Sequence, residues 1–301
     1  MRGRREQIHL PGGQSFRVLR WSQGVRDVEA LLAPGSAVRL KGEGDHWHYH
    51  PAMELACFTA GEGTRFVGDH IAPFAAGDLV LLGEKLPHYW HARGRTAGYA
   101  VQWHFPHGHP FWSFPETLAL AGVFKDAARG LRYTGRTAAA LATALQALAG
   151  SAGPARLGQL LHLFAQLATA PAGDVMPLSS RAFALPTASV HQQAISSAVR
   201  HLLANFRDIV RLDEVLRLTG MSKAAFARQF KQHSGKTFSE FINHIRLQAT
   251  CRELAETDDA VMEIALACGF TQISFFNRLF RRVYRYSPTC YRAKTRRCPN
   301  H

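Results

Sequence analysis

The sequence has little of several features that mark particular protein classes. Its 301 residues contain only five cysteines, and no two of them form a C-x2-C pair, which argues against a disulfide scaffold or a cysteine zinc knuckle. No apolar run reaches the roughly 18 residues of a membrane span. The basic first segment, MRGRREQIHLPGGQ, lacks the apolar core of a secretory signal. We therefore expect a cytoplasmic protein without a membrane partner.

Acidic side chains are also scarce relative to basic ones. Lys and Arg number 36 against 22 Asp and Glu, so the formal net charge is +14, and most of this excess lies after residue 190. Such an excess suits nucleic acid or an anionic surface. A hydrophobic content of 47% excludes a largely disordered chain, and the length suffices for two hydrophobic cores.

The two ends of the chain differ in composition and in periodicity. All five Trp lie in the first 112 residues. There, short apolar or alternating runs end at Gly or Pro, a pattern typical of a β-sandwich or barrel. From Pro115 the sequence becomes Ala- and Leu-rich with helical periodicity, and the stretch 170–189 is typical of a flexible connector. Helical periodicity resumes near His191.

The last third contains an internal repeat with a period of about 50 residues. The aligned pairs are Glu214 with Glu263, Val215 with Ile264, Gly220 with Gly269, Phe226 with Phe276, Arg228 with Arg278, Phe230 with Phe280 and Lys231 with Arg281. Each copy predicts a short helix, a turn with Gly and a second helix whose two Phe face inward. This is the helix-turn-helix pattern, whose second helix can enter a DNA major groove. Ser222 and Thr271 are the expected N-caps of the second helices.

A plainer interpretation of the repeat is two helical hairpins in a generic bundle, with surface Arg side chains that are only solvated. The outward Arg at matching positions, Arg228 and Arg278, favours the DNA-binding interpretation.

Residues 191–296 resemble the C-terminal domain of the AraC/XylS family of transcriptional regulators. The segment EIALACGFTQISFFNRLFRRVYRYSPTCYR is very similar to the signature of that family. The resemblance implies two helix-turn-helix units, joined by a long helix over FSEFINHIRLQATCRELAE, that bind adjacent major grooves of promoter DNA. It further implies a contact with RNA polymerase if the protein is an activator. The DNA-binding candidates are Ser222, Lys223, Ala224, Ala227, Arg228, Gln272, Ile273, Ser274, Asn277, Arg278 and Arg281.

Two positions depart from the family pattern. Leu216 stands where members usually have a small residue, and Arg285 stands where they usually have Gly. The second departure suggests an altered left-handed turn after the second recognition helix.

The stretch from Gly42 to Gly61 fits the pattern G-x5-H-x-H-x3-E-x6-G at every fixed position. This is the first motif of the cupin family, and a weaker second motif contains Gly77 and His88. The resemblance implies a small cupin-type β-barrel over about residues 15–110. We therefore predict an α+β chain with three parts. They are a cupin-like effector-binding barrel over 1–112, a helical connector and linker over 113–190, and an all-α domain with two helix-turn-helix units over 191–296.

Four side chains of this barrel can form one polar cluster. His48 and His50 are two residues apart and share one face of a strand. With Glu54 and His88 they supply three imidazoles and a carboxylate, a donor set suited to a divalent metal such as Zn, Mn or Fe(II). The alternative is that they hydrogen-bond one another or contact an organic effector, with no metal.

Aromatic residues near this cluster can line a ligand cavity. Indole faces stack on sugar rings or aromatic acids. Together with the family resemblance, this makes a sugar or related metabolite the expected effector class. The alternative for each Trp is barrel core. The effector-binding candidates are Trp47, His48, His50, Glu54, His88, Trp90 and Trp103.

The leading hypothesis is a transcription regulator controlled by a small effector, not an enzyme, because the sequence shows no convincing nucleophile–base constellation apart from the cluster of His48, His50, Glu54 and His88. The helical segment 115–168, with the apolar face of LGQLLHLFAQLATA, can supply homodimer contacts or face the interior of one chain. One alternative is a metal-dependent cupin enzyme, a dioxygenase or isomerase with a helical appendage. Another is a nucleoid-type protein without sequence preference, which would show a steep salt dependence and no specific site.

Overall fold

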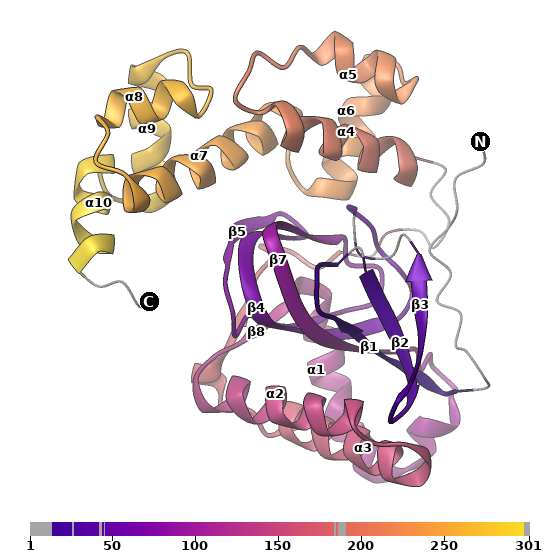
Figure 1. Ribbon diagram of the computed structural model, residues 1–301. Helices are drawn as coiled ribbons and strands as arrows, with labels where there is room; N and C mark the ends of the chain where they lie inside the picture. Colours follow the sequence, from indigo (N-terminus) through magenta and orange to yellow (C-terminus); the bar gives the residue numbers. More distant parts are fainter. Residues whose placement is uncertain are drawn as a thin grey trace. The chain divides into compact units, whose positions relative to one another are not determined.

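The computed structural model describes residues 14–25, 27–41, 44, 46–183, 185 and 191–297. Its contacts divide the chain into two units, residues 1–192 and 193–301. Figure 1 shows a sheet with attached helices in the first unit and helices alone in the second. The basic segment 1–13, Gly42 of the first motif and Cys298 lie outside the described residues.

The first unit contains an antiparallel sheet. Its strands are β1 (Phe16–Trp21), β2 (Asp27–Ala33), β3 (Ser36–Lys41), β4 (Met53–Val67), β5 (His70–Phe74), β6 (Leu79–Leu82), β7 (His88–Trp103), β8 (Leu131–Tyr133) and β9 (Val175–Pro177). The strand order is β3-β2-β1-β7-β4-β6-β8-β9, and β5 pairs with β4. The register between β4 and β7 runs from Met53 opposite Trp103 to Val67 opposite His88.

The apolar runs of the central strands are continuous because both faces of the sheet are covered. On β4, Leu55 and Cys57 belong to the apolar cluster that includes the helices. The intervening Ala56 and Phe58 belong to a second cluster on the opposite face of the sheet. Successive strand residues point to opposite faces, so two buried faces require an unbroken apolar sequence.

Helices follow the sheet as the composition predicted. They are α1 (Leu120–Asp126), α2 (Gly135–Ala149) and α3 (Gly153–Ala168), with short 3-10 turns η2 (Pro110–Ser113), η3 (Pro115–Ala119), η4 (Ala127–Arg129) and η5 (Ala172–Asp174). Helix α2 contacts β1, β7 and α3 (Figure 1). Leu145 and Leu163 are fully buried between the two helices and the sheet.

The sequence predicted a flexible connector over residues 170–189. For residues 170–183, the part of this stretch that the structure describes continuously, the prediction is wrong. Strand β9 pairs with β8, with Leu131 opposite Pro177. After β9, the backbone N–H groups of Leu178 and Phe183 donate to carbonyls of residues 130 and 128, and both side chains are buried. Because the partners lie some 50 residues earlier in the chain, the Pro- and Ser-rich composition did not indicate this docking.

The second unit is entirely helical in its described part. Its helices are α4 (Gln192–Asn205), α5 (Leu212–Thr219), α6 (Lys223–Ser234), α7 (Phe238–Glu256), α8 (Val261–Ala267), α9 (Ile273–Tyr284) and α10 (Pro288–Arg297). The predicted linking helix coincides with α7, which begins at a capping box formed by Thr237 and Glu240. Among the described residues, no helix is both long and apolar enough to cross a membrane.

Candidate functional site

The two copies of the repeat fold as the alignment predicted, each with a helix, a turn and a second helix. Gly220 ends α5 in the left-handed conformation, with φ +64°. Ser222 caps α6 by accepting a hydrogen bond from the N–H of Ala225, which confirms that N-cap. The expected cap Thr271 is wrong, because Gln272 holds the N-cap position of α9 and makes no side-chain capping bond.

Helix α6 presents its polar side to solvent because its aromatic side is buried. Phe226 and Phe230 are almost fully buried, and the ring of Phe230 contacts Phe241 of α7 edge-on at a centroid distance of 5.3 Å. The candidate residues of this first copy are all exposed, namely Ser222, Lys223, Ala224, Ala227 and Arg228.

Helix α9 repeats this arrangement with more polar groups. Phe276 and Phe280 are fully buried. Gln272, Ser274, Arg278 and Arg281 are exposed, and Ile273 and Asn277 are half-buried. Two further exposed cations at the end of the helix, Arg282 and Arg285, were not among the candidates, although charge alone marks them as groups that can meet phosphate.

Arg285 adopts the left-handed conformation after α9, with φ +64°. Gly235 holds the equivalent position after α6, with φ +70°. The turn after α9, which was expected to be altered, therefore keeps its left-handed geometry. Arg285 adopts there a conformation that favours Gly.

Arg285→Gly is expected to stabilise the second unit by about 0.5–1 kcal/mol. The gain is the relief of left-handed strain, reduced by the greater freedom of Gly in the unfolded chain. Thermal unfolding should show a midpoint several degrees higher, and Gly235→Ala should lower it. An unchanged or lower midpoint for Arg285→Gly would show that the Arg285 side chain makes a compensating contact.

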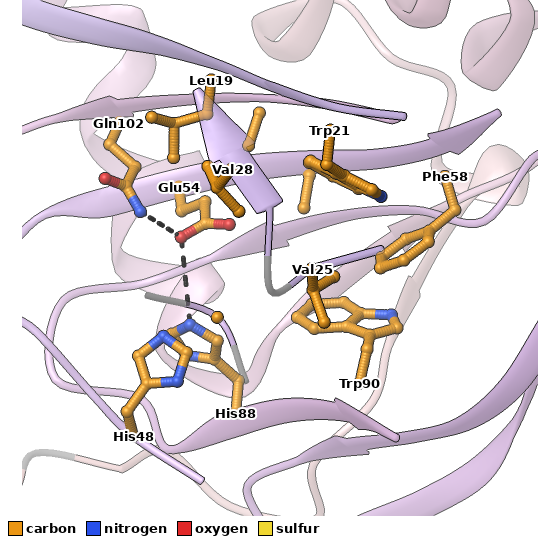
Figure 2. Close-up of a pocket in the computed structure, with 13 residues that line it drawn as sticks. Leu19, Trp21, Val25, Val28, His48, Glu54, Phe58, His88, Trp90 and Gln102 are labelled. Atoms are coloured by element: carbon orange, nitrogen blue, oxygen red, sulfur yellow. Dashed lines mark hydrogen bonds and ion pairs between the residues drawn. The ribbon is translucent and has the colours of Figure 1, made fainter. Parts of the chain in front are cut away.

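The first unit contains a pocket lined mainly by side chains of strands β1, β2, β4 and β7, with a polar end and an apolar end (Figure 2). The residues that line it are Leu19, Trp21, Val25, Val28, Gly44, His48, Glu54, Ala56, Phe58, His88, Trp90, Ala100 and Gln102. Its free volume is about 50 Å³, enough for a few water molecules and well below the ~150 Å³ of a cavity that admits benzene. An effector as large as a sugar must therefore widen this pocket.

Aromatic rings form the apolar end. Phe58 stacks on Trp90 at a centroid distance of 5.5 Å and contacts Trp21 edge-on at 5.0 Å. Trp47 and Trp103, although proposed with Trp90, are not among the lining residues. Trp103 packs with Phe164 in the cluster beneath the helices.

The predicted histidines meet, since His48, His50 and His88 each place one ring nitrogen within 4.8 Å of the others. His48 and His88 line the polar end of the pocket, whereas His50 is not among the lining residues. The Nδ1 atoms lie 2.7, 2.9 and 2.8 Å from the backbone carbonyl oxygens of His46, Ala52 and Leu86, respectively. A carbonyl oxygen only accepts hydrogen bonds, so each Nδ1 carries the hydrogen. A ring that is neutral then keeps its lone pair on Nε2. The hydrogen bond between His50 Nε2 and Glu54 is different, because it requires a proton on one of those two atoms.

Glu54 completes the cluster. Its Oε2 lies 3.1 Å from His50 Nε2 and 3.9 Å from His88 Nε2. Burial alone would raise the pKa of Glu54, but the hydrogen bond with His50, electrostatic interaction with His88 and His50, and the hydrogen bond from Gln102 lower that pKa to about 2. Burial, together with the neighbouring His48 and His50, holds the pKa of His88 well below its usual value.

Two residues that the sequence did not indicate hold Glu54 in place. Gln102 Nε2 donates to Glu54 Oε2 at 2.6 Å, and the buried Arg17 donates from Nε to the amide oxygen of Gln102. The amide of Gln102 is therefore oriented by Arg17, with its N–H toward the carboxylate. Arg17 and Gln102 pair across β1 and β7, and no local spacing relates them to the motif.

The donor set fits a divalent metal ion. His88 Nε2 is buried and makes no hydrogen bond in the structure. Once the proton of the His50–Glu54 hydrogen bond is released, the cluster offers three Nε2 lone pairs and an ionised carboxylate in one buried place. These are ligands that Zn, Mn and Fe(II) accept. Backbone carbonyls fix all three ring orientations, as is usual for histidines that bind metals.

Comparison with known proteins identifies the class of the second unit. Residues 215–294 match the family described as a helix-turn-helix domain. The transcriptional activator RhaS of Pectobacterium carotovorum subsp. carotovorum is 22% identical over 263 residues, which cover 81% of this chain and 86% of that protein. The transcriptional regulator MtrA of Neisseria gonorrhoeae is 40% identical over 81 residues, 27% of each chain.

Among solved structures, a transcriptional regulator from Chromobacterium violaceum with an AraC-type DNA-binding domain is 28% identical. The match covers 36% of this chain and 96% of that one, with a TM-score of 0.34. The sequence matches show a helix-turn-helix domain over residues 215–294. The relatives are transcriptional regulators, not enzymes.

Proposed function

We propose that this protein is a sequence-specific regulator of transcription that reads two neighbouring DNA half-sites with α6 and α9. The observation that carries the proposal is the duplicated unit itself, in which Arg228 and Arg278 occupy matching exposed positions on the two second helices. An exposed Arg on a recognition helix can bind guanine through two hydrogen bonds. The net charge of +14 supplies attraction for the phosphate backbone.

Base reading is favoured over binding without sequence preference because α9 exposes neutral hydrogen-bonding groups as well as charge. Gln272 and Ser274 are exposed beside Arg278. Neutral polar side chains add little to phosphate attraction but can hydrogen-bond to base edges in the major groove.

In vitro selection from a library of random duplexes tests this proposal. The full chain should enrich duplexes that contain two short elements about one helical turn, 10–10.5 base pairs, apart. Failure to enrich any sequence, with affinity that depends only on salt concentration, would support the nucleoid-type alternative instead.

The first unit acts as a cupin-type effector domain whose polar cluster binds a divalent metal through His48, His50, Glu54 and His88. The orphaned Nε2 of His88 and the carbonyl-fixed ring orientations support this assignment. When bound, the metal would supply a positive centre that attracts an anionic or oxygen-rich small molecule. The apolar end, with Trp90 and Phe58, would hold the hydrophobic body of that molecule.

Residues 178–183 couple the pocket to the C-terminal part of the chain in this proposal. Leu178, Phe183 and Leu86 belong to the same apolar cluster as the pocket residue Trp90, and the carbonyl of Leu86 accepts the hydrogen bond from His88 Nδ1. Asp69 also binds this segment, accepting from Ser179 Oγ at 2.7 Å and from the N–H of Ser180 at 2.9 Å. A ligand that fixes His88 would thus tighten the docking of 178–183. Coupling of this kind requires that the ligand binds more tightly to the state in which residues 178–183 are docked than to the state in which they are released.

Metal binding is therefore expected to protect the bond after Arg181 from trypsin. Arg181 is exposed and its guanidinium lies 4.5 Å from the ring of the docked Phe183, so cleavage requires release of the segment. Adding Zn²⁺ to the full chain should slow this cleavage several-fold, and Phe183→Ala should speed it with or without Zn²⁺. Equal rates with and without Zn²⁺ in the wild type would refute the coupling.

The outer face of the α2–α3 hairpin is assigned to a second copy of the chain. Between residues 137 and 173 the sequence has one Lys, Arg, Asp or Glu, which is Arg156, and this side chain is buried and donates to the carbonyl of Leu31. Leu157 and Leu161, one helical turn apart, are 49% and 46% exposed. A face without charge and with exposed Leu has the composition of an interface core.

Leu161→Glu is accordingly expected to shift a dimer to monomer, because it would bury a carboxylate in an apolar contact. Sedimentation velocity of the full chain at micromolar concentration measures the shift. The control is Ile209→Glu, which places the same charge at a 74% exposed apolar residue of the other unit and should leave the dimer intact. A wild-type monomer, or a Leu161→Glu variant that remains dimeric, would contradict this assignment.

A further inference from the structure

The connection between α4 and α5 forms a second junction between the two helix-turn-helix copies, in addition to the linking helix α7. Arg246 of α7 donates from Nε to the carbonyl of Phe206 at 2.8 Å and from a terminal nitrogen to the carbonyl of Asp208 at 2.9 Å. Arg207 of the same connection donates to the carbonyl of Ala267, at the end of α8, at 3.1 Å. The segment that leads into the first copy is therefore bonded both to α7 and to the second copy.

The turn of the second copy is shaped to receive this connection. A Cβ atom on Gly269 would lie 2.5 Å from the carbonyl oxygen of Phe206, 2.9 Å from that of Arg207 and 2.8 Å from Arg246 Nε. The equivalent Gly220 of the first copy has nothing within 4 Å of its Cβ position. The two aligned glycines thus share a positive φ, of +64° and +89°, but only Gly269 also provides space for another backbone.

The side chain of Phe206 strengthens the same junction. It packs against the apolar cluster of the second copy, which includes Cys268 and Phe270 on either side of Gly269. Arg207 also pairs with Glu253 of α7 at 2.8 Å. The connection, the second turn and α7 therefore close a ring of contacts, and a closed ring resists bending more than a single helix does.

We infer that Arg246 and Gly269 are positioning residues that fix the distance between α6 and α9, and thereby the half-site spacing that the protein accepts. The inference rests on the proposed function, because it concerns how two DNA elements are read together. One inserted base pair moves a half-site by about 3.4 Å along the duplex and rotates it by roughly a tenth of a turn. A rigid pair of recognition helices cannot follow both changes, whereas a pair that flexes about α7 can follow them in part.

The test uses a duplex obtained by the selection described above and two versions of it with one or two base pairs inserted between the half-sites. Fluorescence anisotropy gives the dissociation constant of the full chain for each. For the wild type, one inserted base pair should weaken binding at least about 10-fold relative to the parent duplex, the equivalent of 1.4 kcal/mol. For Arg246→Ala, the same insertion should weaken binding less than about 3-fold, although this variant binds the parent duplex more weakly than the wild type does. Arg246→Lys should lie between the two.

The two glycines provide a matched control. Gly220→Ala and Gly269→Ala both place a side chain at a positive φ, but only Gly269→Ala displaces the connection. Gly269→Ala should therefore tolerate insertions as Arg246→Ala does, and Gly220→Ala should lose as much affinity for one inserted base pair as the wild type. If Arg246→Ala and Gly269→Ala both lost as much affinity as the wild type for that insertion, the inference would be overturned.

A measurement without DNA separates this inference from the proposed function. Spin labels at the exposed, aligned positions Gln232 and Arg282, in a chain with Cys290 and Cys298 replaced by Ser, report the distance between α6 and α9. The distribution should be narrow in the wild-type background and broad with Arg246→Ala. Equal widths would overturn the inference even if specific DNA binding is found. If the chain selects no DNA sequence, the proposed function fails while the labels still test the junction.

Discussion

Arg228→Ala is expected to abolish the preference for one guanine in the α6 half-site. The base contacts expected on the exposed face of α6 are Ala224, Ala227 and Arg228. Of these, only Arg228 has a side chain that donates hydrogen bonds, whereas the two Ala can only touch thymine methyl groups. An Arg that binds guanine through two hydrogen bonds contributes about 1–3 kcal/mol of discrimination, or roughly 5- to 150-fold. The loss should appear at one position of the site and leave the α9 half-site unchanged.

Competition binding with single-base variants of the selected duplex measures this effect. Lys231→Ala is the matched control, since it removes another exposed cation from α6. It should weaken binding to all duplexes about equally and reduce the slope of affinity against salt by about one. If Arg228→Ala also weakened every duplex equally, Arg228 would be a phosphate contact and not a base reader.

His88→Ala is expected to lower the affinity for a divalent metal by more than about 100-fold. Changes in residues that only orient metal ligands already cost 10- to 100-fold, and His88 supplies one of the four donors. Isothermal titration of the chelator-treated full chain with Zn²⁺ should show one tight site in the wild type. The loss should be similar in Glu54→Gln, which keeps the shape of the side chain but removes its charge.

His104→Ala is the control, because His104 is exposed and pairs with Glu84 at the surface. It should leave the tight site intact, and the near-ultraviolet circular dichroism of the Trp residues should confirm that each variant is folded. A wild-type protein that binds Zn²⁺ no more tightly than His88→Ala does would contradict the metal assignment. The cluster would then be a hydrogen-bonded effector site without a metal.

The second unit was predictable because its signals are local. A repeat of about 50 residues aligns Phe226 with Phe276, and the helical spacing of each Phe pair determines which side of α6 and α9 is buried. Helix α7 begins where the predicted linking helix begins, because the capping box of Thr237 and Glu240 marks that start in the sequence itself.

The pocket and the junction were only partly predictable because they depend on contacts between distant residues. The motif spacing indicated His48, His50, Glu54 and His88, and these four do meet. Gln102 reaches Glu54 from 48 positions away, and such a pairing follows from strand register, which a single sequence does not reveal.

Buried aromatic residues show the same limit. Trp90 lines the pocket and Trp103 lies in the cluster beneath the helices, although both are on β7. Their positions differ in parity, so they point to opposite faces of the sheet. The sequence shows this parity, but which face holds the pocket is determined only when α2 and α3 cover the other one.

The affinity of the full chain for its selected duplex, compared with a scrambled duplex of equal length and composition, tests the central claim most directly. Anisotropy titrations at about 0.15 M salt should give a dissociation constant of roughly 10⁻⁸ M or lower for the selected duplex, and at least about 10³-fold weaker binding to the scrambled one. The two salt slopes should be similar, because phosphate contacts are common to both complexes. Equal affinity for the two duplexes would contradict the account of a sequence-specific regulator.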